Sequence, residues 1–201
     1  MIDDQHHRHA ALVRVTHWIH TMSFFALLIS GTAILLAHPR LYWGETGGYG
    51  SPALIELPLP LNMDQSGWGR SLHFLAAWIA VGTGSCYVLT GIWRGHFRSN
   101  SNSDMLQYNA WQRRTYLTVV FALLPLMITT GLAMSPAVAS AIPLLPNIFG
   151  GHQSSRTFHF FTAALLTLFL IVHVVNVYRA GFGDRMRAMI FGRTAAGIRE
   201  T

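Results

Sequence analysis

Four long runs without a charged residue limit what this chain can fold into. They cover about residues 15–37, 71–93, 115–135 and 157–178, and arginines stand close to most of their ends. The fourth predicted span, 157–179, includes Arg179 at its end. Each run has about 20 residues or more, enough for a helix rising 1.5 Å per residue to cross roughly 30 Å of hydrocarbon. We therefore predict an all-α integral membrane protein with a bundle of four transmembrane helices.

The composition agrees with a membrane location. Of the 201 residues, 51% are hydrophobic and 11% are charged, whereas soluble domains carry about 25% charged residues. All 14 basic residues are arginines that lie between the apolar runs, so the positive charge fits membrane topology better than nucleic-acid binding. The single cysteine, Cys86, excludes an internal disulfide framework and a C-x-x-C-H haem attachment site.

The distribution of the arginines predicts the orientation of the spans. Eleven lie in the two tails and in the loop between the second and third spans, and the other side has three: Arg40, Arg70 and Arg156. By the positive-inside rule both termini are cytoplasmic. The polar N-terminus has no small-residue cleavage site, so we expect the first span to be retained.

We expect one domain, residues 1–201, in the bacterial cytoplasmic (inner) membrane, with residues 38–70 as a long periplasmic loop. This loop is rich in glycine, proline and aromatic residues, so it should be irregular, with room for a short interfacial helix. It serves either as a cap over the bundle or as a docking surface for a partner outside the membrane.

Prolines shape the third run. The stretch without a charged residue continues to Ser155, but Pro136, Pro143 and Pro146 interrupt its second half, so the helix should end near Ser135. Pro125 lies inside the span, where membrane helices tolerate proline, and we expect a kink there.

Histidines on the predicted helices are the main candidates for a functional site, because ionisable side chains inside a membrane are costly and usually functional. Five of the 11 histidines lie on the spans, and the third span has none. Two depths emerge: His73 and His159 near the outer face, and His17 or His20 with His173 near the inner face. His159 and His173 are 14 residues apart, on nearly the same side of one helix and about 21 Å apart along its axis.

Two histidines at one depth on two helices can clamp a planar cofactor. A haem b with two axial imidazoles fits this arrangement best. We predict two haem b groups. His73 and His159 bind the iron of one, and His173 binds the iron of the other together with His17 or His20. Five helix glycines would let the ring approach closely: Gly31, Gly82, Gly84, Gly91 and Gly131. Small residues are also ordinary where membrane helices cross.

Arginine precedes histidine by three residues at three places: Arg14–His17, Arg70–His73 and Arg156–His159. This spacing is just under one turn, so each guanidinium shares a face with its histidine and could pair with a haem propionate. The arginines could instead be topology anchors. The repeated spacing favours His17 over His20 as the ligand. His20 is then a residue next to the ligand, a residue on the quinone side, or a passive histidine at a helix interface.

These features resemble a known family. The "RVTHW" start, the single histidine early in the second span, the histidine-free third span and the two histidines of the fourth are similar to the prokaryotic di-haem cytochrome b561 family. That family includes the gamma subunit of membrane formate dehydrogenase, the b-type cytochrome of nickel–iron hydrogenase and the cytochrome b subunit of thiosulfate reductase. The resemblance covers essentially the whole chain and implies the same pairs, His17 with His173 and His73 with His159.

The stretch "YNAWQ" at residues 108–112 resembles a Tyr-Asn-Ala-x-Gln stretch of the formate dehydrogenase gamma subunit that is associated with menaquinone binding. The resemblance implies a quinone site, for menaquinone or ubiquinone, formed by Asn109 and Gln112 with His20 nearby. An amide at the membrane edge can hydrogen-bond a quinone carbonyl. A polar helix N-terminus with interfacial anchors is the alternative.

The segments "HPRLYWGETG" and "GRSLHF" resemble thiosulfate reductase-like cytochrome b subunits, which often pair with molybdenum enzymes of the sulfite-oxidase type. The expected function is electron relay between such a periplasmic redox protein and the membrane quinone pool. Expected partners are lipid, quinone and that protein, without nucleic acid, and homo-oligomerisation is left open. The alternatives are a stand-alone superoxide:quinone oxidoreductase and a haem-free module that transports protons or metal ions.

Overall fold

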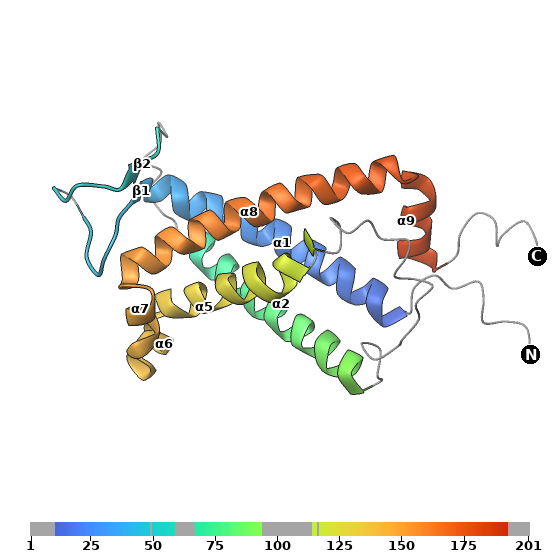
Figure 1. Cartoon of the computed structure of the whole chain (residues 1–201), viewed down its shortest axis with the longest axis horizontal. Helices are drawn as coiled ribbons and strands as arrows, with labels where there is room; N and C mark the ends of the chain where they lie inside the picture. The colour runs from blue at the N-terminus through green and yellow to red at the C-terminus, as the bar shows by residue number, and fades with distance from the viewer. Residues whose placement is uncertain (1–10, 49, 59–66, 94–113, 116, 193–201) are drawn as a thin grey trace, which may run out of the picture. The chain divides into compact units, whose positions relative to one another are not determined.

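The computed structural model describes residues 11–48, 50–58, 67–93, 114–115 and 117–192 (Figure 1). The helices are α1 (Ala11–Ala37), α2 (Trp68–Trp93), the π-helical turn η2 (Val119–Leu123), α5 (Leu124–Met134), α6 (Pro136–Ala141), α7 (Leu144–Ile148), α8 (His152–Arg179) and α9 (Phe182–Phe191). Two short strands, β1 (Arg40–Leu41) and β2 (Ile55–Glu56), form a hairpin.

The described residues group into two compact units, each described by itself below. The first unit holds α1, α2, α9 and the end of α8 from Val172. The second holds the hairpin, η2, α5, α6, α7 and α8 up to Ile171. The expectation of a single domain stays a prediction.

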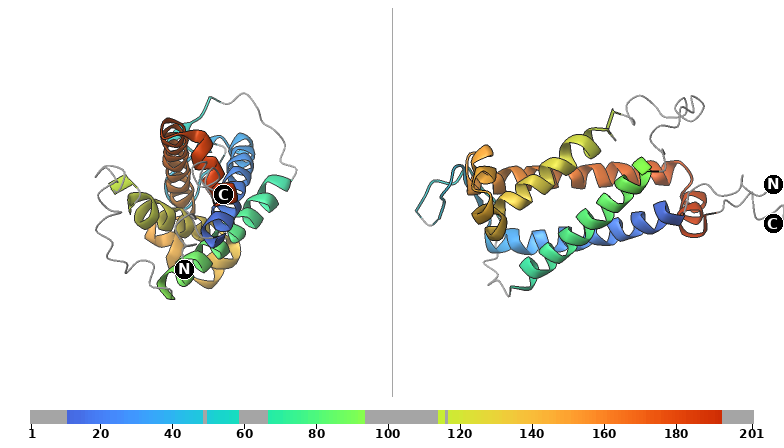
Figure 2. Two further views of the ribbon diagram at one scale, coloured as in Figure 1. Left: turned by 90° about the vertical axis from the view of Figure 1, so that its right-hand side faces the viewer. Right: turned by 90° about the horizontal axis from the view of Figure 1, so that it is seen from below.

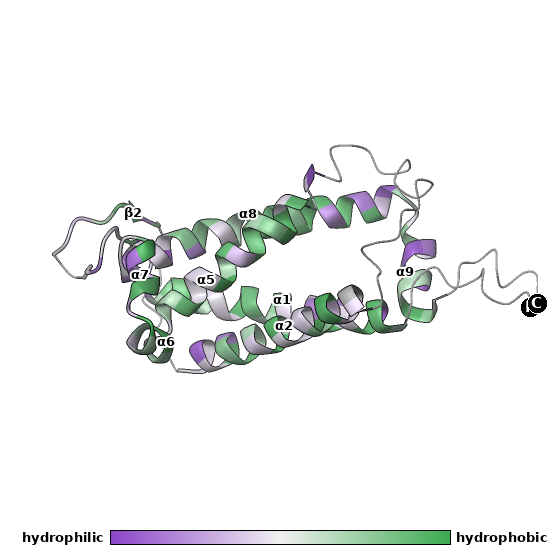
Figure 3. Ribbon diagram, turned by 60° about the horizontal axis from the view of Figure 1, so that its bottom comes forward, coloured by the Kyte–Doolittle hydropathy of each residue, from purple (hydrophilic) through white to green (hydrophobic). Residues whose placement is uncertain are grey.

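Among the described residues, three helices are long and apolar enough to cross a membrane: Ala11–Ala37, Trp68–Thr90 and His152–Arg179. Many of their large hydrophobic side chains are exposed, as Met22, Trp78 and Leu168 illustrate with exposed fractions of 69%, 61% and 57%. Apolar residues run along these helices and polar residues gather near the ends (Figure 3). Surfaces of this kind need hydrocarbon rather than water around them, so the predicted helical membrane architecture is confirmed.

The third predicted span is a shorter apolar helix, Val119–Met134, with helical residues at 114–115 and 117–118 ahead of it. Its π-helical turn η2 ends directly before α5, in which Pro125 is the second residue. Proline has no amide hydrogen and its ring crowds the carbonyl four residues back, so a wider turn accommodates it. The structure thus has a π-helical turn beside Pro125, and the expected kink stays a prediction. The helix ends before Ser135, which is extended because Pro136 follows it.

In the first unit, α1 and α2 lie side by side (Figure 2). Their contacts run in opposite directions along the two sequences. Ser30, late in α1, meets His73, early in α2, whereas His20, early in α1, meets Thr83, late in α2. The two helices are therefore antiparallel, and this register positions the histidines of the candidate site.

In the second unit, the described part of the loop after α1 contains a hairpin and no helix. β1 and β2 pair antiparallel in a register that sets Arg40 opposite Glu56. Arg40 donates hydrogen bonds to the Glu56 carboxylate from Nε at 2.9 Å and Nη2 at 2.8 Å. This hydrogen bonding, together with the charge of Glu56, raises the pKa of Arg40. The loop is thus more ordered than its glycine-rich composition indicates.

The same loop caps the first turn of α8. The Gly44 carbonyl accepts hydrogen bonds from the amides of the second and third residues of that helix, at 3.0 and 3.2 Å. The Glu45 carboxylate accepts a third from the His152 amide at 3.0 Å. Gly151 allows this approach, because its φ is +116° and a Cβ there would lie 2.6 Å from Gly44 backbone atoms. These caps start α8 five residues before the predicted residue 157.

Candidate functional site

All five histidines predicted on the spans lie on described helices. His17 and His20 are in α1, His73 is in α2, and His159 and His173 are in α8. The helix of the third span, Val119–Met134, has no histidine, as expected. In the first unit, the antiparallel register sets His73 at the opposite end of the α1–α2 pair from His17 and His20.

His73 is held between a buried hydroxyl and a glycine of α1. The Ser30 side chain has an exposed fraction of 0%, and its Oγ lies 3.0 Å from the Nδ1 of His73. A Cβ added to the next residue, Gly31, would lie 3.4 Å from the Cε1 of the imidazole. The ring therefore lies against the glycine backbone, with Nδ1 turned to the hydroxyl.

His159 has the same surroundings in the second unit, supplied by a different helix. Thr130 of α5 has an exposed fraction of 0%, and its Oγ1 lies 3.0 Å from the Nδ1 of His159. A Cβ added to Gly131 would lie 3.3 Å from the Cε1 of that ring. A Ser/Thr-Gly dipeptide thus holds an imidazole twice, on unrelated parts of the sequence.

His20 lies in a related but reversed arrangement. Thr83 and Gly84 of α2 flank it, and a Cβ at Gly84 would lie 3.3 Å from its Cε1. Here the nitrogen near the hydroxyl is Nε2, at 3.5 Å, the outer limit of a hydrogen bond. His20 is turned the other way from His73 and His159. The choice of His17 rather than His20 as the ligand in α1 stays a prediction.

These surroundings fit imidazole ligands to haem iron. A histidine bound to a metal usually donates its other ring N–H to an oxygen atom, which fixes the orientation of the ring. At His73 and His159 the hydroxyl lies at Nδ1, so Nε2 is the nitrogen left for iron. No group of three or more His, Cys, Asp or Glu side chains in the described part of the chain could hold a bare metal ion. Haem iron needs no such group of side chains, because the porphyrin supplies its other ligands.

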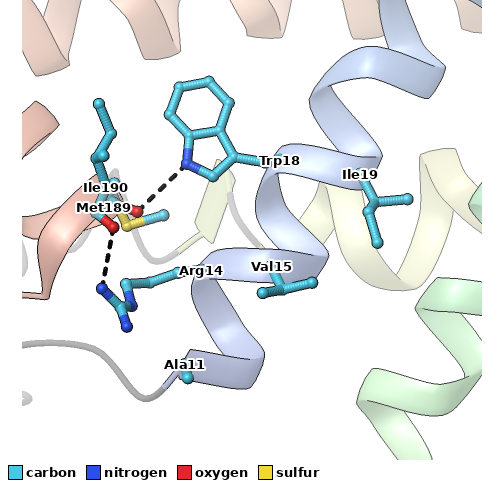
Figure 4. A pocket seen from close by; sticks show the side chains of 7 residues that line it. All are labelled: Ala11, Arg14, Val15, Trp18, Ile19, Met189 and Ile190. Carbon is cyan, nitrogen blue, oxygen red and sulfur yellow. Dashed lines mark hydrogen bonds between the residues drawn. The ribbon is translucent and has the colours of Figure 1, made fainter.

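Two of the three arginines predicted to meet haem propionates donate hydrogen bonds to backbone carbonyls. Arg156 donates from Nη2 to the His38 carbonyl. Arg14 donates from Nη1 to the Ile190 carbonyl at 3.0 Å, and its buried Nε has no partner among the described residues (Figure 4). Arg70 lies in the first turn of α2. The propionate role of all three stays a prediction.

The contact of Arg14 is part of the docking of α9, a helix that the sequence did not predict. Trp18 donates from Nε1 to the Met189 carbonyl at 3.2 Å, one residue before the carbonyl that Arg14 reaches (Figure 4). Gly181 and Gly192, both with positive φ, bracket the helix. The C-terminal end of α9 therefore contacts two side chains near the start of α1.

The predicted quinone residues Asn109 and Gln112 lie outside the described residues, so that site stays a prediction. The sequence also missed two residues of the site, Ser30 and Thr130. A signal was present, because each directly precedes a glycine inside an apolar helix. The dipeptide alone does not reveal which histidine it meets, since that depends on the register between helices.

Apolar helices of this length, with histidines set against buried hydroxyls and glycines, place the chain in the class of multi-pass membrane proteins. Comparison with known families then gives the particular family. The profile of the prokaryotic cytochrome b561 family matches residues 8–192. The chain therefore belongs to the prokaryotic cytochrome b561 family, and the resemblance read from its histidines is confirmed. Membership makes it a membrane protein of electron transport that uses haem b.

A curated relative is similar over most of its length. It is the putative protein-methionine-sulfoxide reductase subunit YedZ1 of Azospira oryzae, 26% identical over 193 residues. The match covers 84% of this chain and 89% of the relative. The two proteins therefore have about the same extent.

Proposed function

We propose that this protein is a di-haem cytochrome that carries electrons between the membrane quinone pool and a periplasmic oxidoreductase. Family membership supports haem b and electron transport. The observation that carries the ligand assignment is the matched setting of His73 and His159, each with Nδ1 at a buried hydroxyl and its ring against a glycine. When bound, haem b supplies a one-electron couple, and the protein supplies ligation, insulation and tuning of the potential.

The four ligands fall into two pairs at two depths. His17 and His173 hold the inner haem, and His73 and His159 hold the outer one. The pairing rests on the depths of the histidines in the sequence. The antiparallel register of α1 and α2 supports it, because it separates His17 from His73 along the helix axis.

The name of the relative supports a more specific partner. It describes a subunit of a protein-methionine-sulfoxide reductase, so we infer an oxidoreductase of that kind, of the molybdenum-containing type expected from the sequence. Reduction of a sulfoxide consumes two electrons and two protons, and yields a thioether and water. A quinol that becomes a quinone releases two electrons and two protons. The electrons would therefore run outward, from quinol near Asn109 and Gln112 to the partner.

The loop of residues 38–58 supports a partner on the outer side. It is fixed to α8 by backbone hydrogen bonds, and its hairpin is closed by the Arg40–Glu56 ion pair. Trp43 in this loop has an exposed fraction of 58%. An ordered loop with an exposed aromatic side chain suits docking better than an irregular one, because less conformational entropy is lost on binding.

The test is a haem count on the purified protein. The dithionite-reduced spectrum should show a b-type α band, and a pyridine haemochrome assay should give two haems per chain. His73→Ala and His173→Ala should each retain one haem, whereas the control His152→Ala at the start of α8 should retain both. Loss of both haems or of neither in the two ligand variants would contradict the pairing. Haem reduction by superoxide in the isolated chain would favour the stand-alone enzyme.

A further inference from the structure

We propose that Ser30 and Thr130 are positioning residues for the outer haem, and that they fix the tautomers of His73 and His159. This inference rests on the proposed function for the identity of the ligands. Each hydroxyl accepts the Nδ1–H of one histidine. The Nε2 of that ring is then left unprotonated, with its lone pair available to iron.

The direction of the hydrogen bond between Ser30 and His73 depends on which atom receives the single proton of the Ser30 hydroxyl. The Oγ of Ser30 lies 2.6 Å from the Ala26 carbonyl oxygen, one turn back in α1. Two oxygen atoms at this distance need a proton between them, because their lone pairs would otherwise repel. Ser30 therefore donates to the carbonyl, and toward His73 it has only a lone pair to offer. The contact at 3.0 Å is then an N–H group of His73 that donates to Ser30.

Thr130 repeats this logic in the second unit. Its Oγ1 donates to the Leu126 carbonyl at 2.7 Å, so it can only accept from the Nδ1 of His159 at 3.0 Å. Its exposed fraction of 0% leaves no water to compete for the lone pair. Both histidines proposed for one haem are thus held in the Nδ1–H tautomer by the same device.

The glycines complete the arrangement. Gly31 and Gly131 let the Cε1–Nδ1 edge of each ring approach a helix backbone, with Cε1 only 3.4 or 3.3 Å from where a Cβ would be. The ring can then turn little about its long axis, so the acceptor stays in line with Nδ1. At His20 the hydroxyl lies nearest Nε2 instead, at 3.5 Å, so this site does not orient that ring as the hydroxyls orient His73 and His159.

The acceptor at Nδ1 also has an electronic consequence. A hydrogen bond from Nδ1–H raises the basicity of the ligand and so favours ferric over ferrous iron. Ser30→Ala and Thr130→Val remove the hydroxyl acceptor, so each should raise the midpoint potential of the same haem. The rise should be smaller for Ser30→Ala, because the Leu27 carbonyl also accepts a hydrogen bond from His73. A tenfold loss of the preference for ferric iron corresponds to a rise of about 59 mV for one electron. The other haem should keep its wild-type midpoint.

The experiment is a redox titration with low-spin EPR spectra on the purified haem-loaded protein. Ser30→Thr and Thr130→Ser keep the acceptor and should restore the wild-type midpoint. Thr32→Val and Thr129→Val are matched controls, because each removes a hydroxyl that donates to the carbonyl one turn back without an imidazole beside it. These controls should leave both midpoints unchanged, which separates tautomer control from a loss of helix stability.

Each outcome decides one of the two proposals. Wild-type midpoints and EPR spectra in Ser30→Ala and Thr130→Val, in a protein that holds two haems, would overturn this inference and leave the proposed function intact. Upward shifts in different haems would instead contradict the pairing of His73 with His159 in the proposed function. Wild-type protein without haem would overturn the proposed function itself. If Ser30→Ala fails to accumulate, Ser30→Cys takes its place, and if Thr130→Val fails to accumulate, Thr130→Ala takes its place. The replacement must show the same upward shift, and an unchanged midpoint counts against the inference.

Discussion

The substitution Gly131→Ala perturbs the candidate site by a small and defined amount. The new Cβ would lie 3.3 Å from the Cε1 and 3.8 Å from the Nδ1 of His159. Carbon atoms in contact prefer about 3.5–4.0 Å, so the imidazole must move by roughly 0.2–0.7 Å. The Nδ1 of His159 is 3.0 Å from Thr130, and a shift of this size brings that hydrogen bond toward the limit of about 3.5 Å.

The effect on global stability should be small. Overpacking costs about 1–3 kcal/mol, and replacing glycine by alanine in a helix returns up to about 1 kcal/mol. The local effect should be larger, because a ligand must be held to within about 0.5 Å of its productive geometry. We expect Gly131→Ala to retain two haems, to change the low-spin EPR signal of one of them, and to alter that midpoint alone.

A matched control separates this effect from a general response to alanine. Gly82 is also in a membrane helix, but a Cβ there would meet no atom within 4 Å. It follows His73 by nine residues in α2, about half a turn away from the ligand face. Gly82→Ala should therefore leave the EPR spectrum and both midpoints unchanged. If Gly131→Ala and Gly82→Ala gave the same spectra, close packing of glycine against His159 would not position the ligand.

Three further predictions concern other parts of the chain. Gly151→Ala should destabilise the cap on α8 by about 1–3 kcal/mol from backbone strain alone, seen as faster proteolysis of the 38–58 loop, whereas Gly48→Ala, with nothing within 4 Å of its Cβ, should not. Trp18→Phe should release the end of α9, at a cost of about 1 kcal/mol, and speed amide exchange there. Unchanged exchange would mean that the indole contact is incidental. Asn109→Ala or Gln112→Ala should each raise the KM for quinol about tenfold if it loses one hydrogen bond, and an unchanged KM would remove that residue from the quinone site.

The sequence predicted the membrane helices well, because a span needs about 20 apolar residues whatever its neighbours are. It predicted the starts less well. α8 begins at His152 rather than near residue 157, since its caps come from Gly44 and Glu45, more than 100 residues earlier in the chain. A local pattern cannot reveal a cap that a distant loop supplies. α9 was missed because its ten residues mix arginines with apolar side chains and read as a tail.

The candidate site was predictable only in part, because the partners of the histidines come from other helices. The histidines stand out because an ionisable group in an apolar run is costly, and their depth follows from counting along each span. The partners of the histidines depend on the register between helices. Ser30 meets His73 and Thr83 meets His20 only because α1 and α2 are antiparallel in one register. Nothing within either helix specifies that register, so the hydroxyls became visible only with the fold.

The loop after α1 and the proposed ligand His159 belong to one hydrogen-bonded structure. Thr157 of α8 donates to the Tyr42 carbonyl at 2.7 Å, and the ring of Trp43 lies 5.4 Å from that of Phe158. His159 is the next residue in α8. Capping the helix and receiving a partner are therefore compatible roles for this loop, since the contacts that cap α8 also fix the helix that carries the ligand. A partner that covered Trp43 would approach the outer haem site through one aromatic side chain.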